Sequence, residues 1–461
     1  MKIFSEKKHF DLFSQIFLAA IFFLVSGIVF FKYSIDISPL IFALLLVLYA
    51  GYFKKVDVSI YPHDLCLLAA LAVFVSIFFA ITLRLPGYAI PAIGFTILVT
   101  LLFDNLEFSF LFSLFFFSLG ASIEGGNLTI GTSLFAGALS ATLLSFRVRK
   151  RFEVIKAGIF SGVVQFLVAF VIEKVKQEQG FVSGLSPDIN LLSICLLNGL
   201  AASVVLIILP IFEYIFRVVT NPSLLELSDL NHPLLRRLIL EAPGTYQHSL
   251  VVANLSEAAA ESIGANALLA RVGSYYHDVG KMIKPNYFVE NIIGFKDIHK
   301  DLKPSMSKLI IINHVKDGVD LAKKYHVNPR IIDFISEHHG KTLVYYFYQR
   351  AKELEPEVQH EEEYRYGGPK PQSKETAIVS IADTVEALSR TLDEPTPSRI
   401  EEMVREVVRK RFRDGELDES NLTLKDLEKI TQKFTHVLNA LFHTRINYPK
   451  DDSDQRQKTK D

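Results

Sequence analysis

The pattern of hydrophobic and polar positions divides the chain into two parts. Up to about residue 217, long apolar runs alternate with short polar segments. Several runs reach the length of roughly 20 residues that a helix needs to cross a bilayer. We therefore predict about eight membrane-spanning helices in this part of the chain. The predicted spans are 12–31, 39–53, 64–83, 88–103, 108–123, 127–145, 154–173 and 190–216.

From about residue 223 the pattern changes to one of amphipathic helices, in which apolar residues recur three and four positions apart. The alternation typical of strands is nearly absent. A polar segment rich in Pro and Gly, 355–373, predicts a long loop. The predicted fold class is all-α, a polytopic transmembrane helix bundle followed by an all-α domain. The helices predicted for this domain are 223–241, 245–263, 265–281, 305–325, 329–339, 341–354, 374–391, 397–412 and 423–444.

Charged residues follow the same division, since 28 lie in residues 1–217 and 71 in residues 218–461. With eight spans, the basic residues near the N-terminus, at 54–55 and at 147–151 all fall on one side, which the positive-inside rule makes the cytoplasm. An even number of spans returns the second part of the chain to that side. We therefore expect a multi-pass protein of the cell membrane. The net charge of −1 indicates no DNA or RNA polymer as a partner.

The predicted organisation has four parts. Residues 1–38 hold an N-terminal segment and an extra span, 39–217 a seven-span membrane domain, 218–445 a cytoplasmic domain, and 446–461 a disordered tail. The two cysteines, Cys66 and Cys195, lie inside apolar runs and have no metal-type spacing, so neither a disulfide framework nor a zinc finger is expected.

Eleven of the thirteen histidines lie after residue 217. Taken singly, His248 or His314 is explained as a core histidine, and Asp383 as a helix cap or ion-pair partner. Taken together, seven residues flanked by apolar neighbours would each need a buried partner. A pair of metal ions provides one for all of them at once. The seven residues are His248, His277, Asp278, His314, His338, His339 and Asp383.

This combination of imidazole and carboxylate, without thiolate, suits two divalent transition-metal ions rather than calcium or magnesium. Seven ligands are too many for one tetrahedral site, but with one bridging carboxylate they form two sets of four. Two such metals activate a water molecule and hold a phosphate for in-line displacement. Adjacent side chains on a helix diverge by about 100°. Side chains that diverge in this way can still reach two different metals. We expect His277 to bind one metal and Asp278 to bind both.

The pocket beside such a centre should bind phosphate. Lys281 lies one turn after His277 and is the expected phosphate contact, the alternative being a solvated lysine at a helix C-terminus. Asp278 and Lys281 are thus the predicted catalytic residues. Four tyrosines are candidates for stacking on a base, with helix packing or loop ordering as the alternative. They are Tyr345, Tyr346, Tyr364 and Tyr366.

The spacing H…HD…D resembles that of the HD superfamily of metal-dependent phosphohydrolases. The string from Leu209 to Lys281, which contains TYQHSL and SYYHDVGK, is similar to the seven-transmembrane HD family. The similarity continues through KPNYFVEN, IIDFISEHHGKTLVYYFYQRAKE and GGPKPQSKETAIVSIADTVEA. It covers about residues 39–445 and rests mainly on hydropathy in the membrane region.

The resemblance implies a membrane-anchored phosphodiesterase that hydrolyses cyclic di-AMP to pApA in a cytoplasmic HD domain, and it leaves a homodimer open. It implies iron or manganese as the metals. One metal would be held by His248, His277, Asp278 and Asp383, and the second by Asp278, His314, His338 and His339. Family members commonly carry a large extracellular domain after the first span. Here KYSIDIS, 32–38, stands in its place, and that domain is expected to be missing.

Two other functions stay open at this point. The same chemistry could serve another cyclic nucleotide such as cyclic di-GMP, although the GYP motif common in HD domains for that substrate is not found. The protein could also be a membrane receptor that binds a nucleotide without turnover. A complete set of metal ligands argues against a receptor, because binding alone needs no water-activating metal pair.

Overall fold

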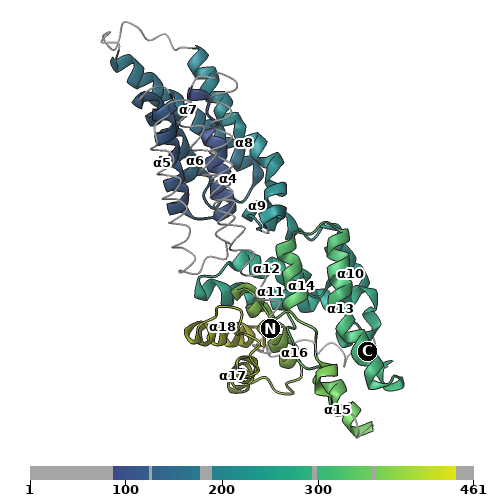
Figure 1. Ribbon diagram of the computed structural model, residues 1–461. Helices are drawn as coiled ribbons and strands as arrows, with labels where there is room; N and C mark the ends of the chain where they lie inside the picture. Colours follow the sequence, from purple (N-terminus) through teal and green to yellow (C-terminus); the bar gives the residue numbers. More distant parts are fainter. Residues whose placement is uncertain are drawn as a thin grey trace, which may run out of the picture. The chain divides into compact units, whose positions relative to one another are not determined.

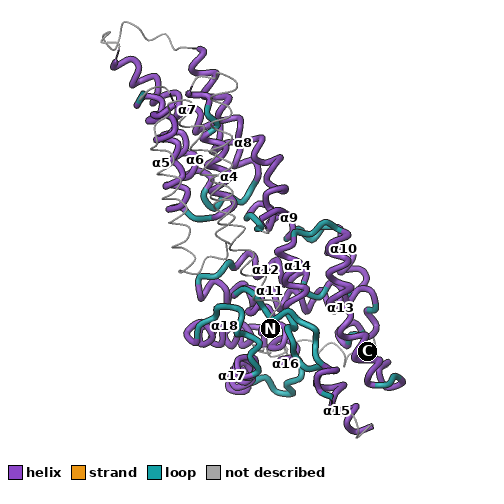
Figure 2. The backbone as a smooth tube through the Cα atoms, viewed as in Figure 1, coloured by secondary structure: helices purple, strands orange, loops and turns teal. Residues whose placement is uncertain are grey.

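The structure is a computed structural model. It describes residues 87–123, 127–176, 189–216, 218–292, 298–354 and 360–442. Within these ranges every named element is a helix, and an isolated antiparallel bridge joins Leu343 to Arg365 (Figure 2). The predicted all-α fold is therefore confirmed.

The chain forms two compact units. One comprises Met1–His232 with His326–Arg330, and the other Pro233–Tyr325 with Ile331–Asp461. The four-part organisation proposed from the sequence, with its limits after residues 38, 217 and 445, stays a prediction. The segment 32–38 and the tail 446–461 lie outside the described residues.

The first unit contains the apolar helices. Three of them, α6, α7 and α8, are long and apolar enough to cross a membrane, and two shorter apolar helices precede them. The runs at 12–31, 39–53 and 64–83 lie outside the described residues, so the predicted number of spans is not tested. The helices are α4 (Ala92–Phe103), α5 (Leu106–Ile123), α6 (Leu128–Ser145), α7 (Arg151–Lys176), α8 (Ile189–Phe216) and the short α9 (Asn221–Leu227).

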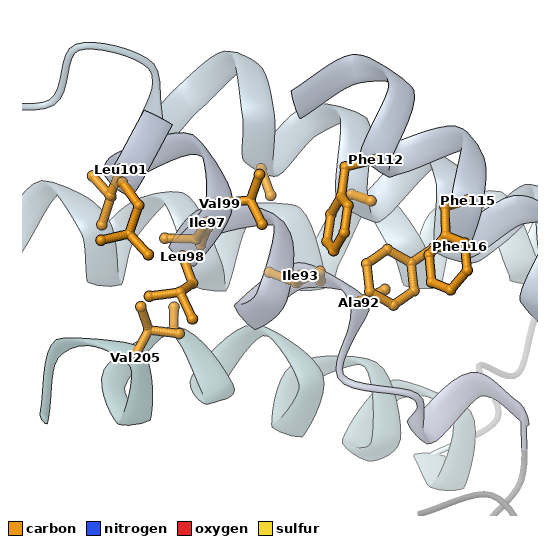
Figure 3. Packing of buried hydrophobic residues seen from close by; sticks show 14 of the residues in the cluster. Ala92, Ile93, Ile97, Leu98, Val99, Leu101, Phe112, Phe115, Phe116 and Val205 are labelled. Carbon is orange, nitrogen blue, oxygen red and sulfur yellow. The ribbon is translucent and has the colours of Figure 1, made fainter. Parts of the chain in front are cut away.

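These helices pack side by side, with α6 between α5 and α7, and α8 against α7 and α4 (Figure 1). Their shared core is rich in phenylalanine (Figure 3). The rings of Phe112 and Phe116 meet edge to face, with centroids 5.3 Å apart. In lipid, helix association depends on close packing and internal hydrogen bonds rather than on the exclusion of water. Such ring contacts therefore contribute to the association of these helices.

Two buried amides complete this unit. Gln165 donates to the carbonyl of Tyr88 at 3.0 Å, and Asn198 donates to the carbonyl of Ile90 at 2.6 Å. Both carbonyls precede α4, and that of Ile90 also accepts from the backbone N–H of Ala92 at 2.7 Å. Backbone groups in a bilayer must be satisfied within the protein, because lipid offers no hydrogen bonds. The two amides thus fix the backbone just before α4 to α7 and α8.

The second unit contains the amphipathic helices. At its centre, α11 packs against α12, α16 and α18, while α13 packs against α15 and the short 3-10 helix η3 (Val279–Ile283). The helices are α10 (Pro233–Glu241), α11 (Pro243–Ile263), α12 (Ala267–Tyr276), α13 (Pro304–Lys324), α14 (Pro329–Glu337), α15 (Tyr345–Leu354), α16 (Lys374–Ser389), α17 (Pro397–Arg413) and α18 (Leu424–Phe442).

The prediction of one helix over 223–241 is wrong, because the chain breaks there into α9 and α10. The side chain of Asp229 accepts from the backbone N–H of Asn231 at 2.9 Å, a turn that competes with the helix. Pro233 then begins α10, in the first turn where its missing N–H costs nothing. Amphipathic periodicity continues across such a turn, so the pattern alone did not reveal it.

Two predicted helices are longer than those observed. The prediction over 265–281 extends beyond Tyr276, where α12 ends and the chain tightens into η3. The prediction over 341–354 begins too early. Val344 donates its N–H to the carbonyl of Tyr364, and Tyr366 donates to that of Thr342, so this part of the predicted loop 355–373 pairs with the segment before α15. Both changes shape the site.

Candidate metal centre

His277 and Asp278 lie at the point where α12 ends. His277 keeps helical backbone angles, but Asp278, at φ −111° and ψ 14°, leaves the helix. This change of direction brings two side chains that would otherwise diverge to one place. The Nε2 atom of His277 lies 3.2 Å from Oδ2 of Asp278, and both residues are buried.

The seven predicted ligands come together in two overlapping groups. Asp278 belongs to both, and within each group the potential ligand atoms all lie within 4.8 Å of one another. Oδ1 of Asp278 is 3.3 Å from Nε2 of His314 and 3.6 Å from Nε2 of His338. The groups are His248, His277, Asp278 and Asp383, and Asp278, His314, His338 and His339.

Backbone carbonyls orient three of the histidines. Because a carbonyl oxygen can only accept, the Nδ1 atom that faces it carries the proton. His277 donates in this way to Ser274 at 2.7 Å, His314 to Ile311 at 2.5 Å, and His338 to Phe334 at 3.0 Å. Each imidazole therefore turns its Nε2 atom toward the centre of the cluster, as metal-binding histidines do.

The atoms that converge in the cluster are mostly hydrogen-bond acceptors, which can bind a cation but cannot bind one another. In the neutral tautomer set by these carbonyls, the Nε2 atoms of His314 and His338 are both acceptors, yet they lie 3.4 Å apart. Oδ1 of Asp278, another acceptor, is buried without a hydrogen bond. Burial of so many acceptors without a donor is costly. A divalent metal placed among them would provide the missing partner, so the residues present fit such an ion.

The histidines of the cluster differ in protonation. Burial, reinforced by the neighbouring imidazole of His338, holds the pKa of His339 well below its usual value, so that ring is neutral. Burial also lowers the pKa of His338. At His277 the effect of burial is outweighed by Asp278, which raises the pKa to about 10. Binding of a metal ion by His277 would therefore require the loss of a proton from the ring.

Glu386 on α16 is a member of the site that the sequence did not reveal. Its Oε2 atom lies 2.5 Å from Nδ1 of His248, whose Nε2 atom is 3.0 Å from Asp383. Glu386 also binds Arg390, at 2.6 Å. Its position three residues after Asp383 places both carboxylates on one face of the helix. That spacing was the available signal.

We expect Glu386→Ala to lower the affinity for the metal at His248 by about 10–100-fold, because the ring loses the acceptor that sets its tautomer and orientation. Metal titration of the purified protein measures the effect. Glu406→Ala removes an exposed glutamate from α17 and serves as control. An unchanged affinity in the Glu386 variant would refute the orienting role.

The side chain of Lys281 is largely enclosed in this structure rather than solvated, with 14% of its surface exposed. Its ammonium lies 2.8 Å from Oδ2 of Asp278 and 2.9 Å from Oε1 of Glu290. Burial alone would lower its pKa, but these carboxylates outweigh that effect and raise the pKa above its ordinary value. Lys281 is therefore charged and lies in contact with Asp278, the carboxylate that the two groups share.

The four candidate tyrosines take different positions. The ring of Tyr366 stacks on His339 with centroids 4.1 Å apart. Tyr345 and Tyr346 begin α15 with 59% and 61% of their surface exposed. Tyr364 is buried with Phe347 and Ala351 in a small core, which favours the ordering of the loop over contact with a base.

Comparisons with known proteins agree with this site. Residues 245–388 match the model of the HD domain, and residues 33–220 match the model described as "7TM receptor with intracellular HD hydrolase". The cyclic-di-AMP phosphodiesterase PgpH of Bacillus subtilis (strain 168) is 38% identical over 405 residues, 86% of this chain and 56% of that protein. PgpH of Listeria monocytogenes serotype 1/2a (strain 10403S) is 47% identical over 244 residues, 53% of this chain and 34% of that protein.

The crystal structure of the L. monocytogenes PgpH HD domain in complex with cyclic-di-AMP is 48% identical, with a TM-score of 0.45, and covers 47% of this chain and 100% of that one. The chain spans about half, and about a third, of the lengths of the two curated relatives. Together, the two family models cover most of the chain, from the apolar helices to the cluster of histidines and aspartates. The chain is therefore a membrane protein with an HD domain, and its apolar part is similar to 7TM receptors with an intracellular HD hydrolase.

Proposed function

We propose that this chain is a membrane-anchored phosphodiesterase that hydrolyses cyclic di-AMP to pApA at the cluster of histidines and aspartates. The observation that carries the proposal is the convergence of buried acceptor atoms from seven side chains in two groups that share Asp278. The names of the two curated relatives support the substrate. Since this chain spans only part of each, activity and substrate both need a direct test.

In this proposal the two groups hold two divalent ions. We propose iron or manganese, both of which accept imidazole and carboxylate ligands. Such a pair supplies an activated water molecule and stabilises the charge that develops on the phosphate. His248, His277, Asp278 and Asp383 would bind one ion, and Asp278, His314, His338 and His339 the other.

The protein's own groups then have distinct tasks. Asp278 presents Oδ1 to His314 and His338, and Oδ2 to His277, so one carboxylate serves both groups. Its burial keeps bulk water away and strengthens every charge interaction in the cluster. Lys281 is proposed to bind a phosphate oxygen beside Asp278. Tyr366, and the exposed Tyr345 and Tyr346, remain proposed contacts for the bases.

Lys281→Ala is expected to raise the KM for cyclic di-AMP by about 10–100-fold, because a hydrogen bond to a charged phosphate contributes about 1.5–3 kcal/mol. The value of kcat should change much less. Steady-state kinetics with the manganese-loaded protein separate the two constants. An unchanged KM would show that Lys281 does not contact the substrate.

The test of the proposed function uses the purified full chain in detergent, loaded with manganese and supplied with cyclic di-AMP. We expect release of pApA, which is measured by chromatography. Cyclic di-GMP is run in parallel, and faster turnover of it would establish the alternative substrate. Tight binding of cyclic di-AMP without pApA would establish a receptor instead.

We also propose that the HD domain lies on the cytoplasmic side of the membrane. The basic segment 147–151, which follows α6 and ends at the first residue of α7, supports this orientation through the positive-inside rule. A cytoplasmic second messenger would then be within reach. A homodimer remains a hypothesis, as does the predicted loss of the extracellular domain, since the segment 32–38 lies outside the described residues.

A further inference from the structure

The carboxylate of Glu290 belongs to neither group of potential metal ligands, yet it contacts a charged residue of the site. Glu290 lies in the 3-10 helix η5 (Val289–Asn291), and its side chain is 14% exposed. Oε1 of Glu290 is 2.9 Å from Nζ of Lys281 and 3.1 Å from Oγ1 of Thr245, which donates to it. A carboxylate buried to this degree and bound on two sides has a defined orientation.

The segment around Glu290 is fastened to the first turn of α11. Thr245 donates its backbone N–H to Oδ1 of Asn291 at 3.0 Å, and Nδ2 of Asn291 donates to Oγ1 of Thr245 at 2.8 Å. The backbone also approaches closely, since a Cβ on Gly244 would lie 1.8 Å from the carbonyl oxygen of Glu290. Thr245 is one helical turn before His248, so Glu290 is held by the same helix that presents a proposed ligand.

Lys281 has two carboxylate partners, and they would respond differently to metal. Asp278 lies in both groups, so bound cations would take up its negative charge. The same cations would repel the ammonium of Lys281 over a few ångströms of poorly screening interior. Glu290 remains available as a counter-charge, because it takes part in neither group. The ring of Phe288, 5.2 Å from the Lys281 ammonium, adds a cation–π contact on the same segment.

We propose that Glu290 is a positioning residue that holds the ammonium of Lys281 beside Asp278 when the metals are bound, so that Lys281 can bind the phosphate. This inference rests on the proposed function, since it concerns the same site: Glu290 contacts Lys281, and Lys281 contacts the phosphate. Glu290 acts through Lys281 and touches neither metal nor substrate. Hydrogen bonds from Thr245 to Asn291 and Glu290, and from Lys281 to Glu290, fix the lysine relative to the first turn of α11.

A double-mutant cycle tests this chain of contacts. Glu290→Gln keeps the size of the side chain and removes its charge. We expect it to raise the KM for cyclic di-AMP about tenfold, with a smaller change in kcat, because contacting groups couple to this extent. In the Lys281→Ala background the same substitution should change KM by less than about twofold. A tenfold effect that persists without Lys281, or no effect in the wild-type background, would overturn the proposal.

Three measurements separate this inference from simple damage to the fold and from failure of the proposed function. Metal analysis should find two ions per chain in wild type and in Glu290→Gln. Glu241→Gln removes the same charge from the exposed ion pair with Arg237 on α10, and should leave KM unchanged. Calorimetric binding of orthophosphate to the manganese-loaded protein should weaken about tenfold in Glu290→Gln. Equal affinities would contradict the inference, whereas absence of pApA from wild type would contradict only the proposed function.

Discussion

Asp278→Ala is expected to abolish the binding of both metals and to lower turnover of cyclic di-AMP by about 10³-fold or more, which corresponds to about 4 kcal/mol or more of lost transition-state stabilisation. The reason is geometric. Asp278 offers one oxygen to His314 and His338 and the other to His277, so its loss removes a ligand from both groups at once. Substitution of a residue that belonged to one group would leave the other intact.

The measurements are metal content by elemental analysis and release of pApA. The membrane helices should remain folded, because Asp278 lies in the other unit of the chain. Asp320→Ala, which removes an exposed aspartate from α13, is the matched control and should keep both metals. Near wild-type turnover with two metals bound to the Asp278 variant would falsify the bridging role.

Gly280→Ala is expected to destabilise the HD domain by about 3 kcal/mol, at the upper end of the usual cost of overpacking. A Cβ at this position would lie 1.8 Å from the carbonyl oxygen of His314 and 2.5 Å from the backbone nitrogen of Gly318. Both atoms belong to the backbone of α13 and cannot rotate away. η3 would have to move off α13, and Asp278 and Lys281 would move with it. Weaker metal binding should therefore accompany the lower stability.

Thermal unfolding followed by circular dichroism at helical wavelengths measures the stability, and metal titration measures the site. The control is Gly367→Ala, since a Cβ on Gly367 would meet no atom within 4 Å. That substitution should change the free energy of unfolding by at most about 0.5 kcal/mol. If both variants unfolded at the same temperature, the close contact between η3 and α13 would not exist in solution.

Much of the helical architecture followed from local pattern. The helices predicted over 245–263, 305–325 and 397–412 appear within two residues of their predicted limits, because each buries one apolar stripe that periodicity reveals. The break between α9 and α10 was missed since Asp229 and Pro233 interrupt the helix without interrupting the apolar period. The early end of α12 was missed because it depends on the backbone of α13, far along the chain.

The site shows the same division. The amino-acid sequence is enough to identify the available side chains, five histidines and two aspartates among apolar residues, since burial of that many polar groups requires a common partner. How these side chains are used depends on the folded structure. It brings Glu386 to His248 and Glu290 to Lys281, and it turns His314 and His338 inward through nearby carbonyls. Distances between separate helices depend on packing between distant segments, which no local pattern records.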